Sequence, residues 1–161
     1  MSISKATITV LKKANPALLD KIVETAARLQ RVKVGVPTGA GTEPEGTPIA
    51  LVAAVHEYGT QDGHIPERPW LRNTIREHLD DYKRLNRINV IKSLQGKMEP
   101  EVAMQQLGMM AKGHVQDFIA NNDYKLNPNT EKQKGSTRAL IDSGNFRQSI
   151  NYVIEPEGSS A

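Results

Sequence analysis

The residues best suited to chemistry lie in the stretch VHEYG, where His56 is followed directly by Glu57. A histidine followed by glutamate opens the helical zinc motif of metalloproteases, in which the second histidine stands four residues after the first. Position 60 holds threonine, so this second ligand is missing. The other histidines have no spacing typical of a local metal site, and they are His64, His78 and His114. We therefore expect no metal and no other cofactor.

Other catalytic patterns are incomplete as well. The glycines at positions 39, 41 and 46 are not followed by the Gly-Lys-Ser/Thr of a phosphate-binding loop. Ser143 stands in DSGN, which is not the GxSxG elbow of a hydrolase and is typical of a turn. The chain has no cysteine, which excludes disulfides, thiolate metal sites and cysteine nucleophiles. We predict that the chain is not an enzyme.

A polar stretch, residues 121–138, carries cations that could contact phosphates: Lys125, Lys132, Lys134 and Arg138. Such side chains give affinity for nucleic acid that does not depend on base sequence. The chain as a whole is close to charge balance, with 21 cationic and 18 anionic residues. A dedicated nucleic-acid binder shows a larger excess on one face. We favour a solvated loop that becomes ordered in an assembly, facing a partner protein or DNA.

Apolar periodicity predicts the elements that position these residues. Helices are expected over residues 15–29, 47–59, from Pro69 onward and 100–120, where apolar side chains recur at steps of three and four. The helix from Pro69 is expected to run as one helix through Tyr82. Gly108 and Gly113 weaken the last helix by about 1 kcal/mol each unless close packing requires them.

Two strands are predicted where apolar residues alternate with polar ones. Residues 32–36 form one strand with a buried valine face, and residues 150–154 form a closing strand that we expect beside it. Residues 6–11 suit a further short strand, or a docking arm within residues 1–12. Residues 38–47 and 121–138 are expected to be flexible polar loops, and residues 156–161 a disordered tail.

These elements indicate an α+β fold: a small mixed antiparallel sheet packed by three to four helices. We expect a single domain, residues 1–161, with two long polar loops and a largely aliphatic core, since aromatics make up only 4% of the chain. No stretch approaches the roughly 18 apolar residues of a membrane span, and the start lacks the apolar run of a signal peptide. We therefore expect no membrane segment and no export by that route.

Two segments carry a resemblance to a known family. In residues 55–75, VHEYGTQDGHIPERPWLRNTI, a helix ends in His-Glu-Tyr-Gly and a loop leads to Ile-Pro, Arg-Pro and an aromatic residue. In residues 140–154, LIDSGNFRQSINYVI, a leucine, a small acidic turn, a glycine and a basic residue lead through Ser-Ile into a strand. In this order and separation they resemble the neck and tail-completion proteins of tailed phages. The resemblance extends over residues 15–155, with mild departures at Ser143 and Phe146, where threonine and leucine are common.

The resemblance implies a structural subunit of a bacteriophage virion without catalytic activity. It implies a homo-oligomeric ring, six-fold or twelve-fold, at the head-to-tail neck or the tail end, needed for joining head and tail. The expected partners are the head-tail connector and the tail-tube or tail-terminator proteins, and DNA passes through the lumen without sequence-specific binding. Assembly in the bacterial host cytoplasm and a final place in the virion follow from this role.

The marker residues of the first segment are the candidate subunit interface: His56, Glu57, Tyr58, Gly59, Pro66, Arg68, Pro69 and Trp70. Proline and glycine make a defined corner, and Tyr58 and Trp70 offer large rigid contact surfaces. The alternative is that the aromatic residues and Pro69 seal the core of one subunit. Alternative functions are a tail terminator, a minor tail component or a basic nucleic-acid-binding module.

Overall fold

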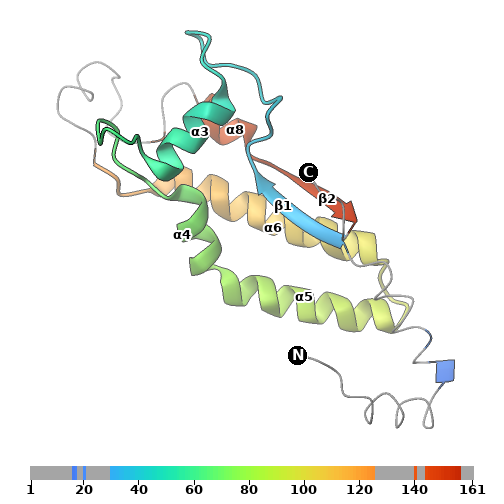
Figure 1. Cartoon of the computed structure of the whole chain (residues 1–161). Coiled ribbons are helices and arrows are strands. Elements are labelled where there is room, and N and C mark those ends of the chain that lie inside the picture. Colours follow the sequence, from blue (N-terminus) through green and yellow to red (C-terminus); the bar gives the residue numbers. More distant parts are fainter. Residues whose placement is uncertain (1–15, 18–19, 21–29, 126–139, 141–143, 157–161) are drawn as a thin grey trace.

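A computed structural model of the chain describes residues 16–17, 20, 30–125, 140 and 144–156. In this part the order of elements is β1 (Gln30–Gly35), α3 (Ile49–Tyr58), α4 (Trp70–Glu77), α5 (Leu79–Leu94), α6 (Pro100–Asn121), α8 (Asn145–Ser149) and β2 (Asn151–Pro156) (Figure 1). The described residues confirm the predicted α+β class. None of their helices is long and apolar enough to cross a bilayer.

The two strands form an antiparallel ribbon, which confirms their predicted pairing. The register places Val32 opposite Ile154 and Val34 opposite Tyr152, so the predicted apolar positions share one face. The other face holds the exposed Val153 and several polar side chains, among them Lys33, whose Nζ lies 2.7 Å from a carboxylate oxygen of Glu155. The alternation therefore predicted both the strands and the side that packs inward.

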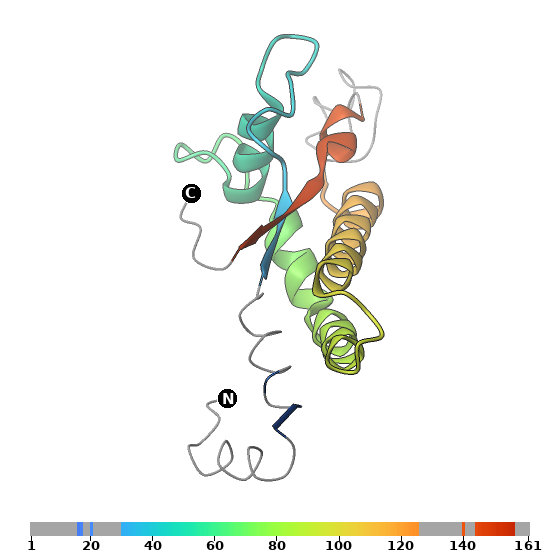
Figure 2. The ribbon, with the colours of Figure 1, turned by 90° about the vertical axis from the view of Figure 1, so that its right-hand side faces the viewer.

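Helix α6 is the central element, because it contacts both strands and helices α4, α5 and α8. Figure 2 shows the ribbon on one side of α6, with α4 and α5 along another. Gly108 lies where the ribbon crosses the helix, and a Cβ there would overlap the Tyr152 ring. Close packing thus explains Gly108, whereas a Cβ at Gly113 would meet nothing within 4 Å.

The helix predicted to run unbroken through Tyr82 is in fact two helices, so this prediction was wrong. His78 has φ −98° and ψ 13°, outside helical geometry, and separates α4 from α5. Figure 1 shows that the two helices meet at an angle, which lets α4 and α5 pack against different parts of α6. The apolar spacing in the sequence runs across the break, so periodicity alone gave no sign of it.

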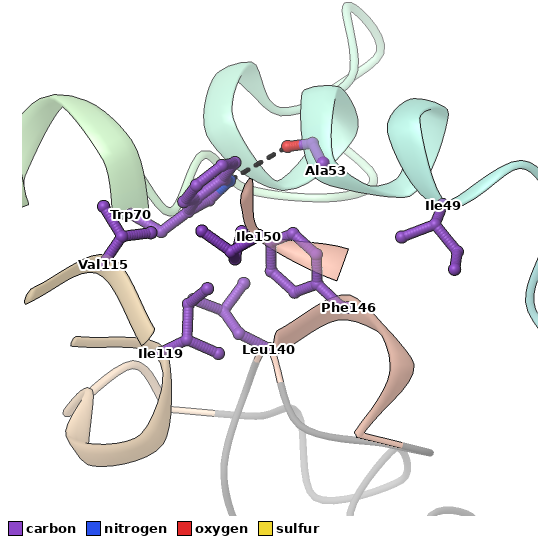
Figure 3. Close-up of a cluster of buried hydrophobic side chains, with 8 residues drawn as sticks. All are labelled: Ile49, Ala53, Trp70, Val115, Ile119, Leu140, Phe146 and Ile150. Atoms are coloured by element: carbon purple, nitrogen blue, oxygen red, sulfur yellow. Dashed lines mark hydrogen bonds between the residues drawn. The ribbon is translucent and has the colours of Figure 1, made fainter. Parts of the chain in front are cut away.

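The buried core of the described residues is largely aliphatic, as expected, and one aromatic pair lies within it. Trp70 and Phe146 lie with ring centroids 5.1 Å apart and planes at 86°, the edge-to-face arrangement that aromatic pairs favour. Aliphatic residues surround them, as Figure 3 shows: Ile49, Ala53, Val115, Ile119, Leu140 and Ile150. The composition was therefore a good guide to the core, and it gave no sign of which aromatic residues would meet there.

Some predictions fall outside the described residues. They are the strand or arm at residues 6–11, most of the helix at residues 15–29, the loop beyond Lys125, the turn at Asp142 and Ser143, and the tail beyond Pro156. The loop of residues 38–47 is described, and it folds through backbone hydrogen bonds such as Glu43 N to Thr47 O at 2.8 Å. An isolated bridge between Thr42 and Pro48 closes its base.

Candidate interaction site

The predicted corner is built on the end of α3, where the chain reverses through Gly59. This residue has φ 70°, and a Cβ on it would lie 2.9 Å from both Glu67 N and Ile65 O. Only glycine fits this conformation at such close approach. The loop that follows folds back on the helix, because Arg68 N donates to His56 O at 2.7 Å. His56, Gly59 and Arg68 are therefore joined in one backbone arrangement.

Glu57 fastens the start of α4 to the end of α3. Its carboxylate accepts hydrogen bonds from the backbone amides of Leu71 at 2.9 Å and Arg72 at 3.1 Å. These amides belong to the first turn of α4, where N–H groups have no partner within the helix and a negative charge is favourable. Glu57 is only 3% exposed, so this carboxylate is a buried helix cap supplied by another helix.

Arg72 completes this connection from the outside. Its Nε donates to the Glu57 carboxylate at 2.7 Å, and a terminal nitrogen donates to the Glu57 carbonyl oxygen at 2.6 Å. The hydrogen bond to Glu57 is the largest cause that raises the pKa of Arg72 above its usual value. The guanidinium also lies 5.1 Å from the centre of the Tyr58 ring. Arg72 was not among the predicted site residues.

Trp70 lies inside the subunit, at 3% exposed, and its indole Nε1 donates to the Ala53 carbonyl oxygen at 3.0 Å (Figure 3). It therefore ties α3, α4 and α8 together. Tyr58 is placed differently, since 69% of it is exposed. Pro66 is exposed, while His56, Arg68 and Pro69 are half-buried.

The corner thus combines both interpretations of its sequence. Glu57 and Trp70 hold the fold of a single subunit, as the core alternative proposed for Trp70. Tyr58 and Pro66 are the members that reach the surface. That Tyr58 and Pro66 contact another subunit stays a prediction.

The predicted basic loop can be placed only at its start. Lys125 is exposed, and Lys132, Lys134 and Arg138 lie outside the described residues.

A pocket that sequence reasoning missed lies where α4, α5 and the carboxyl end of α6 meet. It has a volume of about 530 Å³, and its lining residues are Glu77, His78, His114, Asp117, Phe118, Asn121, Asn122, Asp123 and Tyr124. The rings of His78 and His114 are stacked at 3.7 Å. Residues so far apart in the sequence have no common spacing, so no local pattern could have joined them.

The polar contacts of the two histidines are with α5. His114 Nδ1 lies 3.1 Å from the Tyr82 hydroxyl, and His78 Nδ1 lies 3.3 Å from Asp81. Burial lowers the pKa of His114, and the neighbouring His78 lowers it further. Burial also raises the pKa of Tyr82 to about 12. In the described part of the chain, no group of three or more acidic or histidine side chains is placed to hold a metal ion.

Comparison with known proteins gives no match: no family model, no curated protein and no solved structure is significantly similar to the chain.

Proposed function

We propose that this chain is a non-enzymatic structural subunit of a tailed-phage virion, which assembles into a ring at the head-to-tail neck or the tail end. The observation that carries the proposal is the contact between the two segments that bear the resemblance. Trp70 belongs to the first segment and Phe146 to the second, and their rings meet edge to face at 5.1 Å. The marker residues are thus parts of one folded unit, as a shared structural pattern requires.

Exposed apolar side chains support an assembling protein. Tyr58 is 69% exposed, Met109 64% and Leu51 54%, and these residues lie on two different helices. Single exposed apolar residues are ordinary on any protein, but several on separate elements suit a subunit with more than one neighbour.

The two-stranded sheet supports the same proposal. A ribbon of two strands is only marginally stable by itself. It becomes more stable when it packs on a helix or pairs with another strand. Here one face packs on α6, and within the described residues each strand has one edge without a partner strand. Edges of this kind are available for pairing with another chain.

The ring is tested by negative-stain electron microscopy of the purified protein, alone and mixed with a head-tail connector or tail-tube protein. We expect closed rings, either free or stacked on the connector. Images that show only monomer-sized particles of this protein in every mixture would contradict the proposal.

A second candidate, a nucleic-acid-binding module, is favoured by one feature. Residues 82–98 contain five cations and no acidic residue. This reading predicts duplex-DNA binding by the monomer that weakens steeply as salt is raised. The ring proposal expects little affinity of the monomer for DNA at physiological salt. A DNA titration at several salt concentrations separates the two.

A further inference from the structure

Helix α5 carries apolar side chains on its outer side. Toward α6 it buries polar residues, since Asn89 is 1% exposed and donates from Nδ2 to the Ala103 carbonyl oxygen at 3.3 Å. On the opposite side Ile88 and Ile91 are 45% and 46% exposed. A helix normally turns its apolar stripe toward the core. The outer side of α5 therefore presents apolar side chains that the described residues leave nearly half exposed.

The same outer side also carries cations. Positions three and four apart lie on one side of a helix, and here they combine cations with the two isoleucines. Arg87 and Lys92 are exposed and make no ion pair with the residues that the structure describes. We call this surface the basic face, and it consists of Arg87, Ile88, Ile91 and Lys92. Arg84 is left out because it is paired with Asp81 at 2.6 Å.

The pocket at the other end of α5 has the complementary chemistry. Its acidic residues are Glu77, Asp117 and Asp123, all exposed, and no lysine or arginine is among its lining residues. Phe118 and Tyr124 add aromatic walls, with ring centroids 6.1 Å apart. Carboxylates beside aromatic rings suit a guanidinium or ammonium group. We call this site the acidic pocket.

The two surfaces lie at separate places along the same helix. His78 borders the acidic pocket at the start of α5, and Lys92 lies fourteen residues further along the same helix. At 1.5 Å per residue this is a separation of about 20 Å. Figure 1 shows α5 as a continuous helix leading from its junction with α4 to the opposite end of the molecule. Two different, complementary surfaces on one subunit are what a head-to-tail contact between copies requires.

We infer that the basic face of one copy docks on the acidic pocket of the next copy, with a cationic side chain of α5 entering the pocket. The inference rests on the proposed ring and names the contact that repeats around it. Ile88 and Ile91 supply the apolar area at the centre of the contact, and the charges fix its direction. A head-to-tail contact of this kind produces a ring when the rotation between copies closes.

The test is a charge swap in the full-length chain, followed by sedimentation velocity over a wide range of concentrations. One variant carries Arg87→Glu with Lys92→Glu, and the other carries Glu77→Lys with Asp117→Lys. None of these four side chains makes a hydrogen bond or ion pair that would be lost within the described part of the subunit. Each variant alone is expected to self-associate at least about tenfold more weakly than the wild type, because like charges then face each other.

Mixing the two variants provides the decisive readout. Every contact in an alternating mixture joins opposite charges, so equal amounts are expected to restore association. This restoration also shows that both variants are folded. A control with Glu45→Lys and Asp62→Lys makes the same change of net charge at exposed loop positions outside the pocket, and it is expected to associate like the wild type.

Several results overturn the inference. They are variants that associate as tightly as the wild type, a mixture that fails to restore association, a control that dissociates as far as the pocket variant, and a wild type that stays monomeric at every concentration. The proposed function is judged separately. Rings that form on a connector or tail tube in all of the charge variants would agree with the proposed function. They would contradict only the proposed contact between the basic face and the acidic pocket.

Discussion

Glu57 shows how one side chain can decide a local fold. It is buried at the end of α3, yet its partners are the first amides of α4 and the guanidinium of Arg72. Without a carboxylate here, the part-buried amides of Leu71 and Arg72 would lose their acceptor, which costs more than the hydrogen bonds contribute. The His-Glu-Tyr-Gly signature therefore has a structural meaning at its second position.

The first prediction concerns this carboxylate. Replacing Glu57 by glutamine removes its charge and one acceptor oxygen, so we expect the free energy of unfolding to fall by about 1.5–3 kcal/mol. The measurement is denaturant unfolding followed by circular dichroism. Glu67→Gln is the matched control, because Glu67 contacts the same Arg72 at 3.3 Å but its side chain is 63% exposed. It should change stability by less than about 0.5 kcal/mol, and equal effects of the two would contradict this account.

The lowered pKa of His114 predicts that the free energy of unfolding depends on pH. Burial and His78 lower its pKa, while Asp81, Asp117 and Glu77 oppose the shift. The unfolded chain then takes up the proton more readily than the folded chain. The contribution of neutral His114 to the free energy of unfolding is complete above the pKa of the unfolded chain, about 6.5. It is lost as the pH falls toward the lower pKa of His114 in the folded chain.

We therefore expect the free energy of unfolding to decrease between about pH 7.5 and pH 5, and to decrease less in His114→Gln. Denaturant unfolding at a series of pH values measures both slopes. His64→Gln, at an exposed turn, should keep the slope of the wild type. The same slope in wild type and His114→Gln would show that His114 is not the group responsible.

At the scale of the elements, local signals predicted most of the helices and strands. Alternating valines located β1, and Pro48 and Gly59 bounded α3 closely. The break at His78 was not predictable, because the same apolar spacing continues through α4 and α5 and only contact with α6 fixes the bend. The acidic pocket was missed for a similar reason, since its residues meet only after α6 packs on both helices.

Two glycines of α6 give a prediction with its own control. Gly108→Ala places a methyl group against the Tyr152 ring, so we expect a loss of about 1–3 kcal/mol in the free energy of unfolding. Gly113→Ala meets no atom within 4 Å and should instead gain up to about 1 kcal/mol from better helix propensity. Thermal and denaturant unfolding of both variants measure the two changes in the free energy of unfolding. A stabilising Gly108→Ala would mean that the ribbon does not cross α6 as closely as described.

At the scale of the whole molecule, the α+β class followed from the sequence, whereas the placement of the marker residues did not. Trp70 had the size and rigidity of an interface anchor and is a core residue. Tyr58 is exposed, although it lies on α3 only five positions after Ala53, which accepts the Trp70 hydrogen bond. A sequence pattern does not distinguish a residue that holds a fold from one that contacts a partner, because both uses favour aromatic residues. The burial of each side chain makes the distinction for a single subunit.

The most direct measurement of the central claim is the native mass of the purified protein by light scattering, alone and mixed with a candidate connector or tail-tube protein. The account predicts a discrete species, alone or in the mixture, whose mass contains a fixed whole number of copies, as a closed ring requires. A persistent monomer in both samples, with tight binding to duplex DNA at physiological salt, would contradict the ring and favour the nucleic-acid-binding module.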